Sequence, residues 1–136
     1  MAEAGYSGTP LWKKLGLKPG MRVASLCAPV PYARVVADLP EGIALVDEAD
    51  DTIDLAHLFV TEAALLGREL ERLRKAMRPD AVLWVSWPKK AAKVPTDVTE
   101  DVIRTLALPL GWVDVKVCAV DAVWSGLKLM VRRSER

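Results

Sequence analysis

Short apolar runs alternate with helical or turn patterns along most of the chain, and this alternation constrains the fold more than any other feature. Four runs have the length and composition typical of buried parallel strands: 21–28, 43–47, 53–60 and 81–87. Helical patterns lie between and after them, at 11–16, 32–39, 62–77 and following Thr99. Two last runs, 112–120 and 124–131, are joined by a link short enough for antiparallel pairing. This order predicts a three-layer α/β sandwich, with a mainly parallel sheet and a C-terminal antiparallel hairpin.

Length and charge narrow the class of protein. The 136 residues suit one domain, so we expect a single domain over 1–136, with a flexible arm at 1–8 and a solvated tail at 133–136. A formal net charge of +1 argues against a strong, sequence-independent nucleic-acid binder. No apolar run reaches the roughly 18–20 residues that span a bilayer, and the first residues do not resemble a signal peptide. We therefore expect a cytoplasmic protein without a membrane partner.

Both cysteines, Cys27 and Cys118, lie in apolar runs of strand type. Cysteine is among the most buried residue types, so we expect two buried free thiols in a reducing compartment. The sequence has no CxxC motif and no cluster of Cys and His, which argues against a metal site.

Several short motifs occur in an order that carries a resemblance: Lys18-Pro-Gly20, Arg78-Pro-Asp80, Gly111-Trp112 and the closing run 124–133. Over roughly residues 9–133 this order resembles the class I S-adenosylmethionine (SAM)-dependent methyltransferase fold, which is Rossmann-like. The whole chain is also similar to a bacterial family of domains of unknown function, on the runs 5–11, 57–61, 84–90, 95–97, 99–102 and 120–128. The first resemblance implies a truncated methyltransferase-like fold, and the second implies no activity.

The loop after the first strand departs from the methyltransferase pattern. Where that pattern has an acidic residue and three glycines, this chain has, in order, Ser25, Cys27, Pro29 and Pro31. Glycine lets the backbone approach a ligand, whereas proline has no N–H to offer it and fixes φ. The resemblance therefore makes SAM a possible cofactor, but these residues disfavour it.

The chain is also short between its second and third strands. Only six residues separate Asp47 from Asp54, and they reach about 20 Å when fully extended. A parallel crossover normally needs a dozen or more residues. We therefore expect residues 43–47 either not to form a regular parallel strand or to pair differently.

Ligands in open α/β sheets bind outside the carboxyl ends of the parallel strands. The candidate ligand-binding residues are those expected at that edge, together with two on the last strand: Cys27, Pro29, Tyr32, Asp47, Trp87, Lys89, Lys90, Thr96, Asp97, Trp124 and Lys128. Asp47 stands 20 residues after Cys27 and matches the acidic position that contacts ribose in the resembling fold. No catalytic residue and no metal ligand is predicted.

Two of these groups allow two interpretations each. Lys89 and Lys90, with the helix that begins near Thr99, form either an anion site or a solvated basic loop. Trp124 and Lys128 share one face of a strand, which is either a binding face or a place where Trp124 packs on the core. In the second case Gly126 would allow close approach of the backbone.

His57 is the only histidine, and it lies in the middle of a predicted strand. We expect a core histidine with satisfied hydrogen bonds rather than a general base, which would need a polar partner in a cleft. Ser25 and Ser86 are strand residues and no Gly-x-Ser-x-Gly motif is present, so a Ser-His-Asp triad is disfavoured.

Three hypotheses for function follow. The favoured one is a non-catalytic, methyltransferase-like module that binds a protein partner or a small anionic ligand. The alternative is an enzyme, either a divergent SAM-dependent methyltransferase or one that uses Lys89, Asp97 or Cys27. The third is a homodimer in which residues 124–131 form an edge strand that pairs across a two-fold axis.

Overall fold

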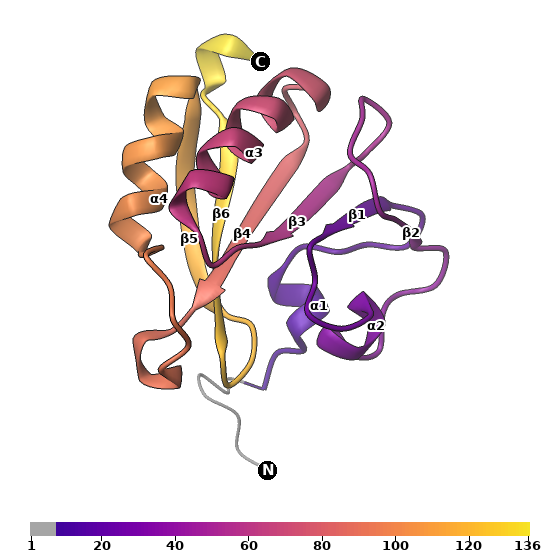
Figure 1. Ribbon diagram of the computed structural model, residues 1–136. Helices are drawn as coiled ribbons and strands as arrows, with labels where there is room; N and C mark the ends of the chain where they lie inside the picture. Colours follow the sequence, from indigo (N-terminus) through magenta and orange to yellow (C-terminus); the bar gives the residue numbers. More distant parts are fainter. Residues whose placement is uncertain (1–7) are drawn as a thin grey trace.

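The computed structural model describes residues 8–136, which form a six-stranded sheet between two layers of helices (Figure 1). The strands are β1 (Arg22–Leu26), β2 (Ala44–Val46), β3 (Leu55–Phe59), β4 (Val82–Pro88), β5 (Trp112–Ala119) and β6 (Trp124–Val131). Their order is β2-β1-β3-β4-β6-β5, and the first four are mutually parallel, whereas β6 is antiparallel to β4 and β5. The predicted three-layer sandwich with a closing antiparallel hairpin is confirmed. Apart from Gly8, the predicted N-terminal arm lies outside the described residues.

Residues 8–136 also contain four helices and three 3₁₀ turns: α1 (Leu11–Lys14), α2 (Tyr32–Val35), α3 (Ala63–Ala76), α4 (Glu100–Ala107), η1 (Lys90–Ala92), η2 (Leu108–Leu110) and η3 (Arg133–Glu135). Residues of α3 and α4 pack on one face of the sheet, and residues of α1 and α2 pack on the other (Figure 1). No helix among residues 8–136 is long and apolar enough to cross a membrane.

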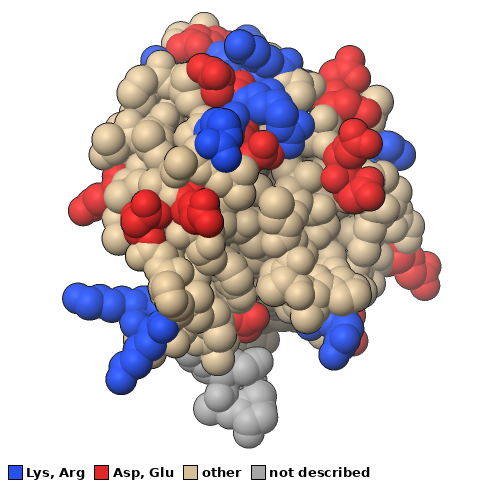
Figure 2. All heavy atoms as spheres, in the orientation of Figure 1, with Lys and Arg blue, Asp and Glu red and all other residues tan. Residues whose placement is uncertain are grey.

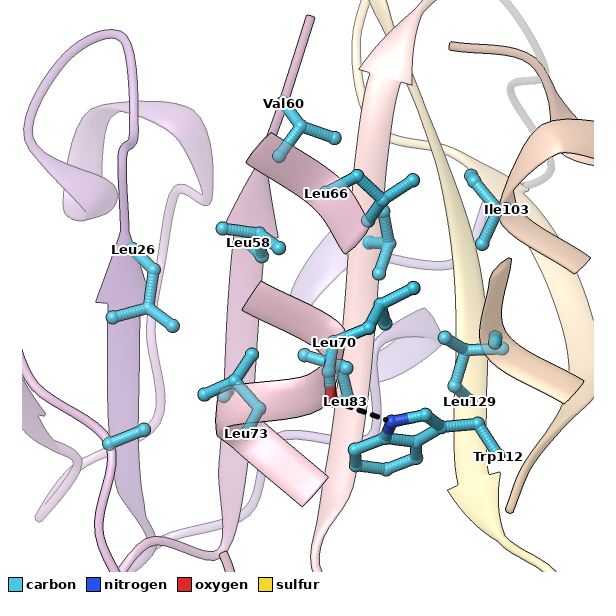
Figure 3. Close-up of a cluster of buried hydrophobic side chains, with 14 of the residues drawn as sticks. Leu26, Leu58, Val60, Leu66, Leu70, Leu73, Leu83, Ile103, Trp112 and Leu129 are labelled. Carbon is cyan, nitrogen blue, oxygen red and sulfur yellow. Dashed lines mark hydrogen bonds between the residues drawn. The ribbon is translucent and has the colours of Figure 1, made fainter. Parts of the chain in front are cut away.

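The larger core lies between the sheet and the α3–α4 layer. Leu66, Leu70 and Leu73 recur at helical spacing along α3, so one stripe of that helix faces the strands and is fully buried (Figure 3). Trp112, at the start of β5, closes the lower end of this core, and its indole Nε1–H donates to the Leu70 carbonyl at 3.2 Å. This bond satisfies the polar atom of a large aromatic side chain that is only 1% exposed.

Trp84 and Trp87 point to opposite faces of β4, as their odd spacing predicts. Trp87 belongs to the larger core and Trp84 to the smaller core beneath α1 and α2, where its Nε1–H donates to the Leu15 carbonyl at 2.9 Å. Gly126 of β6 faces Trp84 so closely that a Cβ there would lie 3.2 Å from the indole. The predicted close approach of the backbone at Gly126 is confirmed.

The expectation that residues 43–47 would not form a regular parallel strand was wrong. Val46 of β2 lies level with Ala24 of β1, and β3 begins at Leu55, level with Val23. Between the end of β2 and the start of β3, the chain therefore moves back by about one residue along the strand direction. It also moves sideways by two strand spacings, so the connection spans about 10 Å in all. Because β2 is only three residues long, a connection this short suffices, and it buries Ala49 and Ile53 in the larger core as it crosses.

From its position before the helix 62–77, Thr61 is the residue that the sequence predicts as the cap of α3, but a residue distant in sequence caps the first turn instead. The residue at the cap position is Glu62, which makes no side-chain capping bond. Instead, Oδ1 of Asp97 accepts a hydrogen bond from the Ala63 N–H at 2.7 Å. A cap from 34 residues away cannot be read from local sequence, because it depends on how the β4–α4 loop folds back.

The helix expected at 32–39 is shorter than predicted, and of the three residues expected to face inward, Ala33, Val36 and Ala37, only Val36 is buried. It ends at Val35, so the pattern at 32–39 overestimated it. Ala33 and Ala37 are exposed, whereas Tyr32 and Val36 are buried. Between two prolines the segment has little room for a helix, and the large Tyr32 ring takes the inward position that we assigned to alanine.

Two further expectations were wrong. Cys27 is exposed and Cys118 is half-buried, although both thiols are free. Cys27 lies one residue beyond β1, and Cys118 lies on the edge strand β5, so neither is enclosed.

Residues 124–131 form an interior strand, β6, and therefore cannot pair across an edge; β5 occupies that edge. The C-terminal residues are exposed, but Glu135 pairs with Arg74 at 2.7 Å.

Candidate functional site

An open pocket of about 810 Å³ lies at the carboxyl ends of β1 and β2. Nine residues line it: Ser25, Cys27, Ala28, Val30, Pro31, Tyr32, Leu45, Val46 and Asp47. Three of the predicted ligand-binding residues, Cys27, Tyr32 and Asp47, thus come together, and Pro29 belongs to the same loop. The pocket occupies the edge where this class of sheet binds its ligands.

The backbone at Cys27 has the conformation that a glycine would ordinarily supply. Its φ is +60°, in the left-handed region that L side chains seldom adopt. The chain therefore makes a sharp turn after β1 without a glycine, and the turn presents the exposed Cys27 thiol toward the pocket. Strained backbone of this kind is common at ligand sites.

The pocket combines one carboxylate with apolar walls. Asp47, directly after β2, is exposed and is the only charged residue among the nine that line it. Val30 and Leu45 are 41% and 42% exposed, which is unusual for large apolar side chains in this protein. A mainly apolar pocket with one or two polar groups is typical of small-molecule sites.

A buried polar chain supports the floor of the pocket. The Tyr32 hydroxyl bonds His57 Nδ1 at 2.8 Å, and His57 Nε2 bonds Ser86 Oγ at 2.6 Å. Neither His57 nor Ser86 is exposed to solvent. Burial lowers the pKa of His57 to about 3, so its imidazole is neutral near pH 7. The predicted core histidine is confirmed.

Contacts between aromatic rings also hold Tyr32 and His57 in place. His57 stacks on Phe59, with centroids 4.3 Å apart, and the Tyr32 ring meets His57 edge-on at 5.4 Å. Burial, with the nearby Cys118, raises the pKa of Tyr32 above its usual value. The Tyr32 hydroxyl thus stays protonated, and it serves to orient the ring rather than to transfer a proton.

The structure adds a cation near Cys27 that its sequence neighbours do not supply. Arg72 of α3 is close enough to interact electrostatically with Cys27 and Glu48, and its pKa is raised mainly by its hydrogen bond to Glu69. The Arg72 guanidinium is already paired with Glu69, at 2.6 Å from Nη2 to Oε1. Only the packing of α3 against the end of β1 brings it there, so local sequence held no signal for it.

The predicted ligand-binding residues at the end of β4 and on the β4–α4 loop lie outside the pocket. Trp87 is 8% exposed and packs in the larger core. Thr96 Oγ1 donates to the Thr61 carbonyl at 2.6 Å, and Asp97 caps α3. Lys89 is half-buried and Lys90 is exposed; their loop lies at the lower left of Figure 1, where Figure 2 shows basic side chains on the surface.

The surroundings of the N-terminus of α4 distinguish between the anion site and the solvated basic loop expected near Lys89 and Lys90. The Thr99 hydroxyl accepts from the Val102 N–H at 3.1 Å, and Glu100 and Asp101 occupy the first turn. With Asp97 at α3, carboxylates already occupy the positive ends of both helices. This arrangement favours the solvated basic loop over an anion site.

The two predicted residues of β6 have different surroundings. Trp124 packs edge-on against Phe59, with centroids 5.3 Å apart, which favours core packing over a binding face. Lys128 lies between Trp84 of β4 and Lys116 of β5 in the register of the sheet. Neither residue lines the pocket at β1 and β2.

Known structures with similar folds include several methyltransferases. A SAM-dependent methyltransferase from Aquifex aeolicus matches with a TM-score of 0.65 and 19% identity, covering 89% of this chain and 87% of the other. A ribosomal protein L11 methylase from Lactobacillus delbrueckii subsp. bulgaricus matches with a TM-score of 0.58 and 13% identity, covering 90% of this chain and 76% of the other. Fibrillarin, a pre-rRNA processing protein from Methanococcus jannaschii, matches with a TM-score of 0.55 and 10% identity, covering 91% of this chain and 69% of the other.

No protein-family model and no curated protein matches the sequence. The identities to the solved structures are low, so they establish architecture and not activity. The strand order, the closing antiparallel pair and these similarities agree with one another. The chain therefore has the fold of the SAM-dependent methyltransferases, in a small version of six strands.

Proposed function

We propose that this protein is a non-catalytic binding module whose pocket at β1 and β2 takes a nucleoside. The observation that carries the proposal is the meeting of the Asp47 carboxylate with the exposed apolar side chains of Val30 and Leu45 around one pocket. A carboxylate accepts hydrogen bonds from the two hydroxyls of a ribose, and apolar walls suit the faces of a planar base.

The charge of the pocket separates a nucleoside from the small anion that we first considered. Asp47 is the only charged residue in the lining, so an anion placed there meets repulsion and finds no cationic lining partner. A neutral diol meets no such repulsion. The preferred ligand is therefore an uncharged nucleoside rather than a phosphate.

The residues fit one half of SAM and not the other. Asp47 and the apolar walls would hold its nucleoside half. Its amino-acid half carries a carboxylate, for which the lining offers no positive group, and Pro29 and Pro31 remove two N–H donors from the loop. This mismatch, together with the burial of His57 and Ser86, supports binding without methyl transfer.

A calorimetric titration tests the proposal. Adenosine and 5′-methylthioadenosine are titrated into the full-length protein, with S-adenosylhomocysteine and 2′-deoxyadenosine as comparison ligands. We expect adenosine to bind, and Asp47→Ala or loss of the 2′-hydroxyl to weaken binding about tenfold, because a hydrogen bond to a charged acceptor is lost. Asp51→Ala removes the same charge from an exposed residue outside the lining and should have no effect.

Two results would contradict the proposal. One is the absence of heat with every nucleoside at millimolar concentration. The other is equal binding by wild-type protein and Asp47→Ala, which would place the ligand elsewhere. Turnover of SAM in the presence of a methyl acceptor would instead favour the enzyme hypothesis.

A further inference from the structure

A second feature of the molecule lies on the face of β5 and β6 that adjoins α1. Lys116 of β5 and Lys128 of β6 are directly opposed in the antiparallel register. Cβ atoms of opposed residues are about 5 Å apart, and two like charges in such a pair destabilise a sheet. The fold therefore maintains a local repulsion that its own stability does not require.

A third lysine reinforces this cluster. Lys18 is close enough to Lys128 to interact with it electrostatically, and partial burial, followed by the charges of Lys116 and Lys18, lowers the pKa of Lys128. Among residues 8–136, no acidic side chain forms an ion pair with any of these three lysines. From Gly8 to Ala37 the sequence contains no Asp or Glu at all, so the side of the cluster formed by α1 and the following turn is basic.

The type of cation indicates the type of anion. Arginine makes the ion pairs that join described carboxylates to the fold, such as Arg78–Asp54 and Arg104–Asp114, because its planar fork matches a carboxylate. The cluster, by contrast, consists only of lysines, which act as compact point charges and commonly bind phosphate. A phosphoryl group with two or more negative charges would neutralise the cluster and relieve its repulsion.

We propose that Lys18, Lys116 and Lys128 form a binding site for the phosphoryl group of a small phosphorylated ligand. Three ammonium groups match one phosphoryl or pyrophosphoryl group in charge. They are too few to follow a nucleic-acid strand, and the net charge of +1 shows no overall excess of basic residues. This proposal is independent of the nucleoside pocket, because none of the three lysines lines it.

Inorganic pyrophosphate is the probe, titrated into the full-length protein at constant ionic strength. We expect Lys116→Gln and Lys128→Gln each to raise the dissociation constant about tenfold, as expected for losing one charged contact. Lys75→Gln, which removes an exposed lysine from the last turn of α3, is the matched control and should bind as the wild type does.

The variant Lys116→Glu provides a second test, in which stability and pyrophosphate binding should change in opposite directions. It replaces the repulsion with an opposed Lys–Glu pair, so the variant should unfold at a higher temperature than wild type while losing pyrophosphate binding. A variant that is more stable yet does not bind cannot be explained by misfolding.

Two outcomes would overturn the proposal. The first is the absence of pyrophosphate binding by the wild type, or binding that is unchanged in Lys116→Glu. The second is binding of a single-stranded RNA oligonucleotide without binding of pyrophosphate, which would assign the face to a polymer rather than to a small ligand.

Discussion

Lowering the pH from about 7 to about 5 should destabilise the protein through one residue, His57. The pKa of His57 is lowered by burial from 6.5 to about 3, so over this range the unfolded chain takes up a proton and the folded protein does not. Stability is therefore lost as the pH falls below about 6.5. At 1.36 kcal/mol per pKa unit, the loss between pH 7 and pH 5 is about 2 kcal/mol.

The chosen range isolates the histidine from the carboxylates. Asp54 has a lowered pKa because its carboxylate accepts from the Arg22 N–H and is paired with Arg78, but its stabilisation is lost only below about pH 4. Asp114 is held in the same direction by Arg104. Near pH 5 both carboxylates are still ionised in the folded and unfolded states.

Urea denaturation at the two pH values measures the effect directly, with His57→Gln as the variant that cannot titrate. We expect a loss of about 2 kcal/mol in the wild type and almost none in His57→Gln. An equal loss in both proteins would refute it. Should the variant fail to fold, NMR of the single imidazole offers the same test, because its resonances should not titrate between about pH 7 and pH 4.5.

Three further predictions concern packing, capping and the pocket. Gly126→Ala should destabilise the protein by about 1–3 kcal/mol in urea, because the new Cβ meets the Trp84 indole, which is held in place by its hydrogen bond; unchanged stability would show that the contact can relax. Asp97→Ala should cost about 1 kcal/mol by removing the cap of α3, seen as a lower urea midpoint, and no change would mean that water replaces the carboxylate. Iodoacetamide should modify Cys27 before Cys118, and bound adenosine should slow that reaction, as mass spectrometry of the peptides would show; equal rates would contradict the assigned exposures.

The architecture was predictable because it follows from local patterns. Leu66, Leu70 and Leu73 mark α3 by their spacing alone, and the three-residue link after Val120 requires an antiparallel turn. The register was not predictable. Because β2 ends at Val46 and β3 begins at Leu55, eight residues rather than six are available to cross β1, and strand ends depend on tertiary packing more than on propensity.

The candidate site was predictable only where it follows from fold position. Asp47 and Cys27 were found because they end two parallel strands at the ligand-binding edge. Val30 and Leu45 carry no motif, and their role depends on remaining exposed beside Asp47. Arg72 arrives from a helix that lies far away in sequence.

The lysine cluster shows the same limit. Lys128 was a candidate from its position on the last strand, but its opposition to Lys116 depends on a register shift between Asp114 and Lys116 in β5. A bulge of this kind changes which side chains share a face. No periodicity in the sequence indicates it.

The most direct test of the central claim is an NMR titration of isotope-labelled protein with adenosine, which reports where the ligand binds as well as whether it binds. We expect the perturbed amide signals to be those of residues 25–32 and 45–47, at the ends of β1 and β2. We also expect Asp47→Ala to remove these shifts. Unperturbed signals in those two segments, with or without shifts elsewhere, would contradict the assignment of this pocket as a nucleoside site.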